Sequence, residues 1–127
     1  FDKSEGKHAW LTRDSSKIEG RDEDRLQNFT FTVSAYRDLF CMVGSSNSKK
    51  WFREYPTAMR TLIMSGDADP VGAYGKAPRY VYKQLLVSGA NDIKLLTYDG
   101  ARHELFNETC REQVFADIVS WLNNGIL

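Results

Sequence analysis

The sequence predicts an α/β fold built on parallel strands, and three observations in its second half lead to this class. Two short apolar runs, residues 60–66 and 92–98, have the length and composition of buried strands. A segment with helical periodicity, residues 77–89, separates them, and another, residues 109–125, follows. Strands joined by a helix of this length are expected to be parallel, with a right-handed crossover.

The strands and helices of this second half each carry their own signal. The first strand reads RTLIMSG and ends at Gly66, and the second reads DIKLLTY with partial alternation. The first helix places Val81 and Leu85 on one face and ends at Gly89. The second helix is expected to begin with a capping box formed by Thr109 and Glu112.

The first half of the chain differs in composition and periodicity from the second, and we place the boundary between residues 58 and 59. Residues 1–28 are polar and charged, residues 31–44 have helical periodicity, and residues 45–55 form a short second helix before Pro56. Parallel sheets need cover on both faces and usually more than two strands. We therefore expect residues 59–127 to be one edge of a larger α/β domain, preceded by a helical insertion, residues 1–58.

Composition excludes several functions. The 127 residues carry 17 basic and 17 acidic side chains, so no net charge selects for nucleic acid or an anionic membrane. No apolar run approaches the ~20 residues of a transmembrane helix. Cys41 and Cys110 are expected to be free, buried thiols. Neither they nor the two histidines have metal-ligand spacing, no cofactor is implied, and we expect a cytoplasmic protein.

Polar residues that can carry chemistry follow both strands. In open parallel sheets functional groups collect at the carboxyl ends of strands, here SGDADPVG and DGARHELFNE. Asp69 and His103 could therefore form a carboxylate–imidazole pair that activates a serine. Asp67 and Asp99 compete for the acid role, but Asp67 is expected to cap the Gly66 turn and Asp99 to form a turn. The alternative is a solvated aspartate and a surface histidine.

These two loops resemble those of a known family. LIMSGDADPVG and YDGARHELFNE resemble the C-terminal part of α/β-hydrolase serine hydrolases, in the branch of lysophospholipases, monoacylglycerol lipases and serine aminopeptidases. In that branch the G-x-x-D-P-V strand end carries the catalytic acid, here Asp69. The G-x-R-H-E-x-x-N-E loop carries the catalytic histidine, here His103. The fold class implied is the last two parallel strands of an α/β-hydrolase with their helices, after part of a helical lid.

The resemblance extends upstream into residues 1–58. WLTRD and DRLQNFTFT are similar to the lid motifs W-L-S-R-D and D-P-L-C-G-F-x-F-T of the branch, with Arg25 in place of proline and Gln27-Asn28 in place of Cys-Gly. Aromatic residues of this segment are expected to line an acyl-binding groove, or else to form the insertion's own packing. Together with Val71 beside the acid, the expected substrate-binding residues are Phe29, Phe31, Tyr36 and Phe40.

The family's nucleophile, the serine of G-x-S-x-G, has no counterpart in this sequence. The resemblance therefore implies a serine, and an oxyanion hole, in an N-terminal part that precedes Phe1. With that part as its partner, the protein is expected to hydrolyse small lipid-like esters such as lysophospholipids or monoacylglycerols. An aminopeptidase or another amide or ester hydrolase is the alternative within the fold, and a non-catalytic binding module is the alternative outside it. The 127 residues alone are expected to be inactive.

Overall fold

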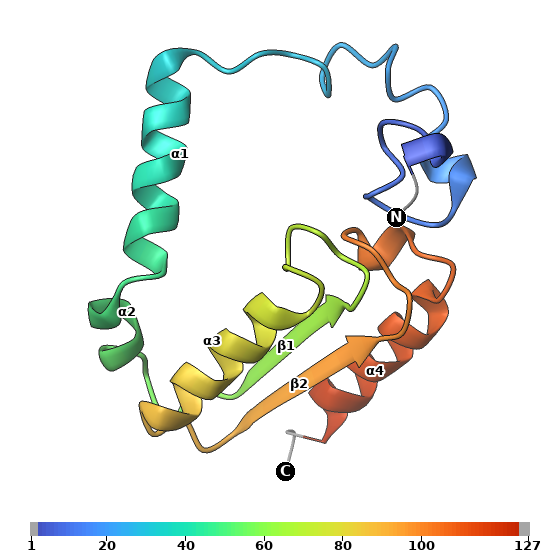
Figure 1. Cartoon of the computed structure of the whole chain (residues 1–127). Helices are drawn as coiled ribbons and strands as arrows, with labels where there is room; N and C mark the ends of the chain where they lie inside the picture. The colour runs from blue at the N-terminus through green and yellow to red at the C-terminus, as the bar shows by residue number, and fades with distance from the viewer. Residues whose placement is uncertain (1–2, 125–127) are drawn as a thin grey trace.

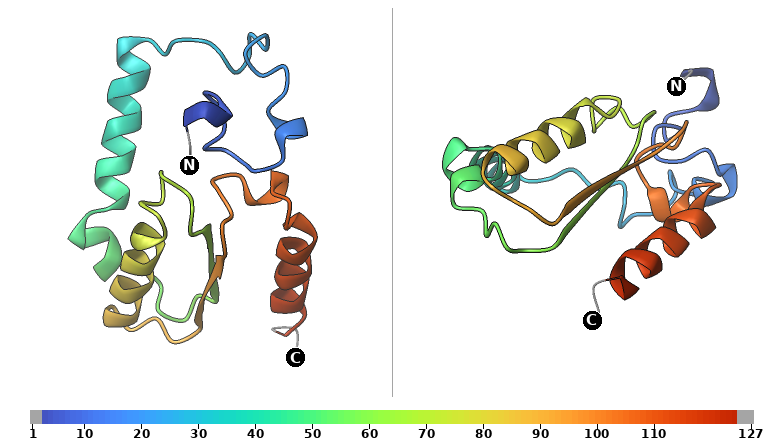
Figure 2. Two further views of the ribbon diagram at one scale, coloured as in Figure 1. Left: turned by 45° about the vertical axis from the view of Figure 1, so that its right-hand side comes forward. Right: turned by 90° about the horizontal axis from the view of Figure 1, so that it is seen from below.

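The computed structural model describes residues 3–124, and its central element is a pair of parallel strands (Figure 1). β1 (Thr61–Gly66) lies beside β2 (Ile93–Tyr98), with Thr61 opposite Ile93 and Gly66 opposite Tyr98. α3 (Lys76–Val87) connects them and covers one face, while α4 (Arg111–Asn123) covers the other (Figure 2). The predicted strand–helix–strand–helix order with a parallel pair is confirmed.

Two small apolar cores lie on opposite faces of this pair. On the α3 side, Phe52 and Tyr55 pack with Leu85 and Ala90. On the α4 side, Tyr98, Ala101 and Val114 form the buried cluster, with partly buried neighbours Met64, Leu96, Leu105, Cys110 and Ile118. The hydroxyl of Tyr98 donates to Asp117, 3.0 Å away, and burial together with this carboxylate raises the pKa of Tyr98 well above its usual value.

The first half is irregular and helical. Two 3₁₀ turns, η1 (Lys3–Glu5) and η2 (Ser15–Lys17), lie near the carboxyl ends of the strands, beside η3 (Leu105–Asn107) (Figure 1). The chain then crosses to the other side of the molecule, where it forms α1 (Val33–Ser46) and α2 (Lys49–Arg53). No residue of α1 is buried, whereas α2 contributes Phe52 to the core.

Side-chain caps begin α1 and α2, while the cap expected for α4 is not formed. Thr32 caps α1 and Ser48 caps α2 through side-chain oxygens that accept from backbone N–H groups three residues later. The capping box expected for α4 is wrong: its N-cap is Cys110, without a side-chain cap bond. The N–H of Thr109 donates instead to the carboxylate of Glu108, 3.0 Å away, so this backbone group is already satisfied.

The structure also bears on two expectations that concern the whole chain, the state of the cysteines and the lack of a transmembrane helix. Both cysteines are free, as predicted, but neither is buried, since Cys41 is exposed and Cys110 is half-buried. Within residues 3–124, no helix combines the length and apolar character needed to cross a membrane.

Candidate active site

The loop that follows β1, residues 67–75, holds Asp69 in a buried position. The Asp69 carboxylate accepts the backbone N–H of Val71 at 2.8 Å, and the Asp69 carbonyl accepts the N–H of Tyr74 at 2.8 Å. Ala73 and Tyr74 have left-handed backbones, with φ of 50° and 56°. Such conformations cost non-glycine residues on the order of 1 kcal/mol each and concentrate at functional sites. The loop is thus strained around a carboxylate that it holds tightly.

The loop that follows β2, residues 99–110, presents His103 to that carboxylate. Nδ1 of His103 lies 3.2 Å from Oδ2 of Asp69. The His103 side chain is 39% exposed, and its Nε2 makes no hydrogen bond to any residue between 3 and 124. One ring nitrogen is therefore held by a buried acid while the other is open to an incoming hydroxyl, the arrangement expected of a base with its orienting carboxylate.

Close backbone contact explains why the two loops meet. β1 and β2 are adjacent and parallel, so both loops leave the same edge of the sheet. The N–H of Ala68 donates to the carbonyl of Ala101 at 3.0 Å, and the N–H of Asp67 donates to that of Tyr98 at 3.1 Å. A pair 34 residues apart is thereby brought within hydrogen-bond distance.

The three competing carboxylates occupy different places. Asp69 is the one bonded to His103. Asp67 was expected to cap the turn at Gly66. Instead it accepts the N–H of Gly100 at 2.7 Å and so links the two loops. Asp99 is exposed in its turn. Of the three, Asp69 is the carboxylate that the structure brings to His103.

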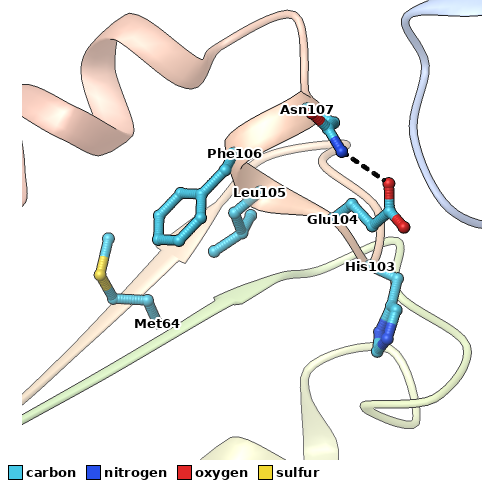
Figure 3. Close-up of a pocket in the computed structure, with 6 residues that line it drawn as sticks. All are labelled: Met64, His103, Glu104, Leu105, Phe106 and Asn107. Carbon is cyan, nitrogen blue, oxygen red and sulfur yellow. Dashed lines mark hydrogen bonds between the residues drawn. The ribbon is translucent and has the colours of Figure 1, made fainter. Parts of the chain in front are cut away.

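A pocket of about 380 Å³ opens beside the histidine (Figure 3). Met64, Leu105 and Phe106 form its apolar wall, and His103 lies at its other end. Its remaining lining residues, Glu104 and Asn107, are hydrogen-bonded to each other at 2.8 Å. The carboxylate of Glu104 also pairs with Arg21 at 2.7 Å, so the pocket's acidic side chain is already compensated.

The expected substrate-binding residues lie apart from this pocket. Phe29, Phe31, Tyr36 and Phe40 form a row of exposed rings at the start of α1, with successive centroid distances of 5.2, 5.3 and 6.4 Å. Val71 is exposed beside the acid. The structure thus brings the acid and the histidine together and groups the aromatic rings, and none of these five residues lines the pocket beside His103.

Sequence reasoning gave Glu108 no role at this site beyond starting the last helix. Glu108 is fully buried, and its carboxylate accepts from the backbone of Arg13, Arg102 and Thr109 and from the Arg13 side chain. Burial alone would raise the pKa of Glu108, but these hydrogen bonds outweigh it and lower the pKa below its usual value. The only sequence signal was its place at the end of the G-x-R-H-E-x-x-N-E motif.

Comparison with known proteins assigns the family. A family model described as serine aminopeptidase, S33, matches residues 3–110. The chain belongs to the serine aminopeptidase family. The match covers most of the sequence, including both loops that form the Asp69–His103 pair. A comparison with curated proteins gave no match.

Solved structures agree on the fold of this serine aminopeptidase family member. A highly thermostable carboxyl esterase from Bacillus coagulans, solved in complex with glycerol, is 27% identical, with a TM-score of 0.83 over 93% of this chain and 39% of the esterase. A lipase in its open form is 24% identical, with a TM-score of 0.85 over 98% of this chain and 40% of the lipase. The chain thus spans about two fifths of the length of these proteins, and the predicted class, part of an α/β-hydrolase fold, is confirmed.

Proposed function

We propose that this chain supplies the acid and the base of a serine hydrolase that cleaves carboxylic esters of lipid-like substrates. The observation that carries the proposal is the Asp69–His103 pair at adjacent strand ends, in which Nδ1 of His103 meets the acid and His103 also lines the pocket. None of the serines in the 127 residues lies in a G-x-S-x-G turn, so we assign the nucleophile and the oxyanion donors to another part of the protein.

Each proton transfer then runs through His103. As the serine Oγ attacks the ester carbonyl carbon, Nε2 takes the hydroxyl proton, and Asp69 stabilises the resulting imidazolium through Nδ1–H. The imidazolium gives that proton to the alcohol oxygen as the C–O bond breaks, which leaves an acyl-enzyme. A water molecule attacks the acyl carbon with His103 again as base, and the proton returns to the serine as the carboxylic acid leaves.

The polarity of the site supports an ester over a peptide with a free α-amine. An aminopeptidase has to bind a cationic amine, for which a carboxylate without a cationic partner is the natural acceptor. Among the described residues that line the pocket beside His103, the acidic side chain is Glu104, and it pairs with Arg21. The apolar wall of Met64, Leu105 and Phe106 suits a neutral substrate. The likeness to the carboxyl esterase points the same way, and an aminopeptidase remains the second candidate because of the family's description.

We assign residues 1–58 to the end of a lid and residues 59–127 to the C-terminal part of the core. The exposed ring row and Val71 are then the surfaces offered to the acyl chain of a lysophospholipid or monoacylglycerol. Rings that are solvent-exposed and in mutual contact lose water when an alkyl chain binds, which supplies binding energy in proportion to the area covered.

The test uses the full-length gene product beside the 127-residue chain. The full-length protein should react with a fluorophosphonate probe and hydrolyse p-nitrophenyl esters faster than aminoacyl p-nitroanilides. The 127-residue chain should do neither, and His103→Ala in the full-length protein should slow both reactions. Probe labelling of the short chain would place a nucleophile within it and refute the assignment. A full-length protein that never labels would make the chain part of a binding module, and faster anilide cleavage would favour the aminopeptidase.

A further inference from the structure

We propose that Trp10 and Glu108 are positioning residues for His103, through which residues 9–13 hold the imidazole against Asp69. The inference rests on the proposed function for its catalytic consequence, but the contacts themselves belong to the fold. His103 is contacted by a segment that lies more than ninety positions earlier in the chain, and this segment precedes the ring row of the proposed lid.

Backbone hydrogen bonds join the two segments at the histidine and at the residue after it. The N–H of His103 donates to the carbonyl of Trp10 at 3.4 Å, and the N–H of Glu104 donates to that of Leu11 at 2.7 Å. The hydroxyl of Thr12 donates to the carbonyl of Asn107 at 2.8 Å. Leu11 and Thr12 are buried, so this side of the histidine's loop packs against the N-terminal segment.

The buried carboxylate of Glu108 bridges the same two segments. One carboxylate oxygen accepts the N–H of Arg102 at 2.9 Å and the N–H of Arg13 at 3.0 Å. The other accepts Nε of Arg13 at 2.9 Å and the N–H of Thr109 at 3.0 Å. A buried carboxylate is tolerated only when its lone pairs are satisfied, as they are here. Because Arg102 directly precedes His103, this charge sets the path of the backbone that carries the imidazole.

Trp10 acts on the ring itself. The Trp10 and His103 ring centroids are 5.2 Å apart at 41°, while Nδ1 of His103 meets Asp69. One hydrogen bond and one ring contact thus act on the imidazole, whose side chain is 39% exposed. Removing the indole would leave the ring free to rotate away from Asp69. A misplacement of about 1 Å at a reacting group can lower the rate about 100-fold.

The experiment compares Trp10→Ala, Trp10→Phe and Glu108→Gln in the full-length protein. Asp22→Asn is the matched control, because Asp22 pairs with Lys7 and His8 within the N-terminal segment and is exposed. Readouts are kcat and KM for a short-chain ester, and the proton NMR signal of the hydrogen-bonded Nδ1–H, assigned by its loss in His103→Ala. The NMR readout reports on positioning even if substrate turnover cannot be measured.

Trp10→Ala is expected to lower kcat about 10- to 100-fold with KM changed by less than about twofold, and to weaken the Nδ1–H signal. Trp10→Phe should restore most of both, Glu108→Gln should resemble Trp10→Ala, and Asp22→Asn should match the wild type. An unchanged kcat and Nδ1–H signal in Trp10→Ala would overturn the inference. Absence of ester turnover and probe labelling in the wild type would defeat the proposed function instead, and a retained Nδ1–H signal in Trp10→Ala would still defeat this one. If Glu108→Gln does not fold, the two Trp10 variants decide the question.

Discussion

Gly66 and Ala101 are in such close backbone contact that a Cβ atom on Gly66 would lie 2.0 Å from the carbonyl oxygen of Ala101. No side chain fits between the last residue of β1 and the loop that carries His103. The contact fixes the separation of the two loops, and with it the distance from Asp69 to His103. The glycine at this strand end is therefore required by close approach, since its backbone φ is not in the left-handed region.

Gly66→Ala is expected to lower the free energy of unfolding of the full-length protein by at least about 2 kcal/mol, because only a backbone shift can relieve the clash. Gly44→Ala is the matched control, since nothing lies within 4 Å of its Cβ position in α1. That variant should leave stability unchanged or raise it by up to about 1 kcal/mol. Urea unfolding measures both, and equal effects at the two glycines would contradict the close-contact account.

Under the proposed function, Asp69→Asn in the full-length protein is expected to reduce kcat by about 10³- to 10⁴-fold, because the amide no longer stabilises the imidazolium. Asp67→Asn, in the same loop, keeps an oxygen able to accept the N–H of Gly100 and should change kcat less than about threefold. Steady-state ester hydrolysis distinguishes the two. Comparable losses in both variants would show that Asp69 is not the distinct acid.

Glu108 is expected to make stability depend on acid pH. Its pKa is lowered in the folded state, so its contribution to stability is complete above the unfolded value near 4.5 and is lost as the pH falls through the folded value. The stability gap between the wild type and Glu108→Gln should therefore be widest near neutral pH and shrink below about pH 4.5. Urea unfolding at a series of pH values provides the measurement, and a gap that widens on acidification would contradict the assignment.

Burial on α3 should decide the cost of truncating its apolar residues. Leu85 is 2% exposed within the core between α2, α3 and β1, whereas Val87, two residues later, is 83% exposed. Leu85→Ala is expected to cost about 2–5 kcal/mol, and Val87→Ala less than about 0.5 kcal/mol. A large effect at Val87 in the full-length protein would mean that another part of the molecule covers this face.

Phe40→Ala tests the ring row as an acyl-binding surface. Phe40 is 68% exposed, so its removal should change stability by less than about 0.5 kcal/mol. If the ring contacts the acyl chain, KM for long-chain esters should rise several-fold while KM for acetate esters stays constant. Equal effects on short and long esters would remove the row from the substrate-binding surface.

The regular elements could be predicted because their signals are local. The apolar runs, the helical periodicity and the glycine stops each lie within the element they define, and all four core elements occur where they were expected. The start of α4 could not be predicted, because the N–H of Thr109 is satisfied by Glu108, whose position depends on Arg13 in a distant segment. α1 was predicted from its apolar spacing, yet no residue of it is buried in the described structure.

The candidate pair could be predicted because parallel neighbouring strands bring their end loops together, whatever lies between them. Asp67 was misjudged since its partner, Gly100, belongs to the other loop and not to its own turn. Trp10 and Glu108 were within recognised motifs, but the contacts of Trp10 with His103 and of Glu108 with Arg13 join residues more than ninety positions apart. Pairwise contacts of that range leave no periodic signal in a single sequence.

The lack of buried residues in α1 within the described structure has an evolutionary consequence. Because no side chain of α1 is buried in the core of the described residues, substitutions along this helix are expected to carry little penalty for the packing of this core. Under the proposed function, relatives would diverge in substrate by varying this helix, while the residues that hold His103 against Asp69 stay constant. If the ring row binds the acyl chain as proposed, directed evolution for a new acyl preference would do best to randomise α1 first.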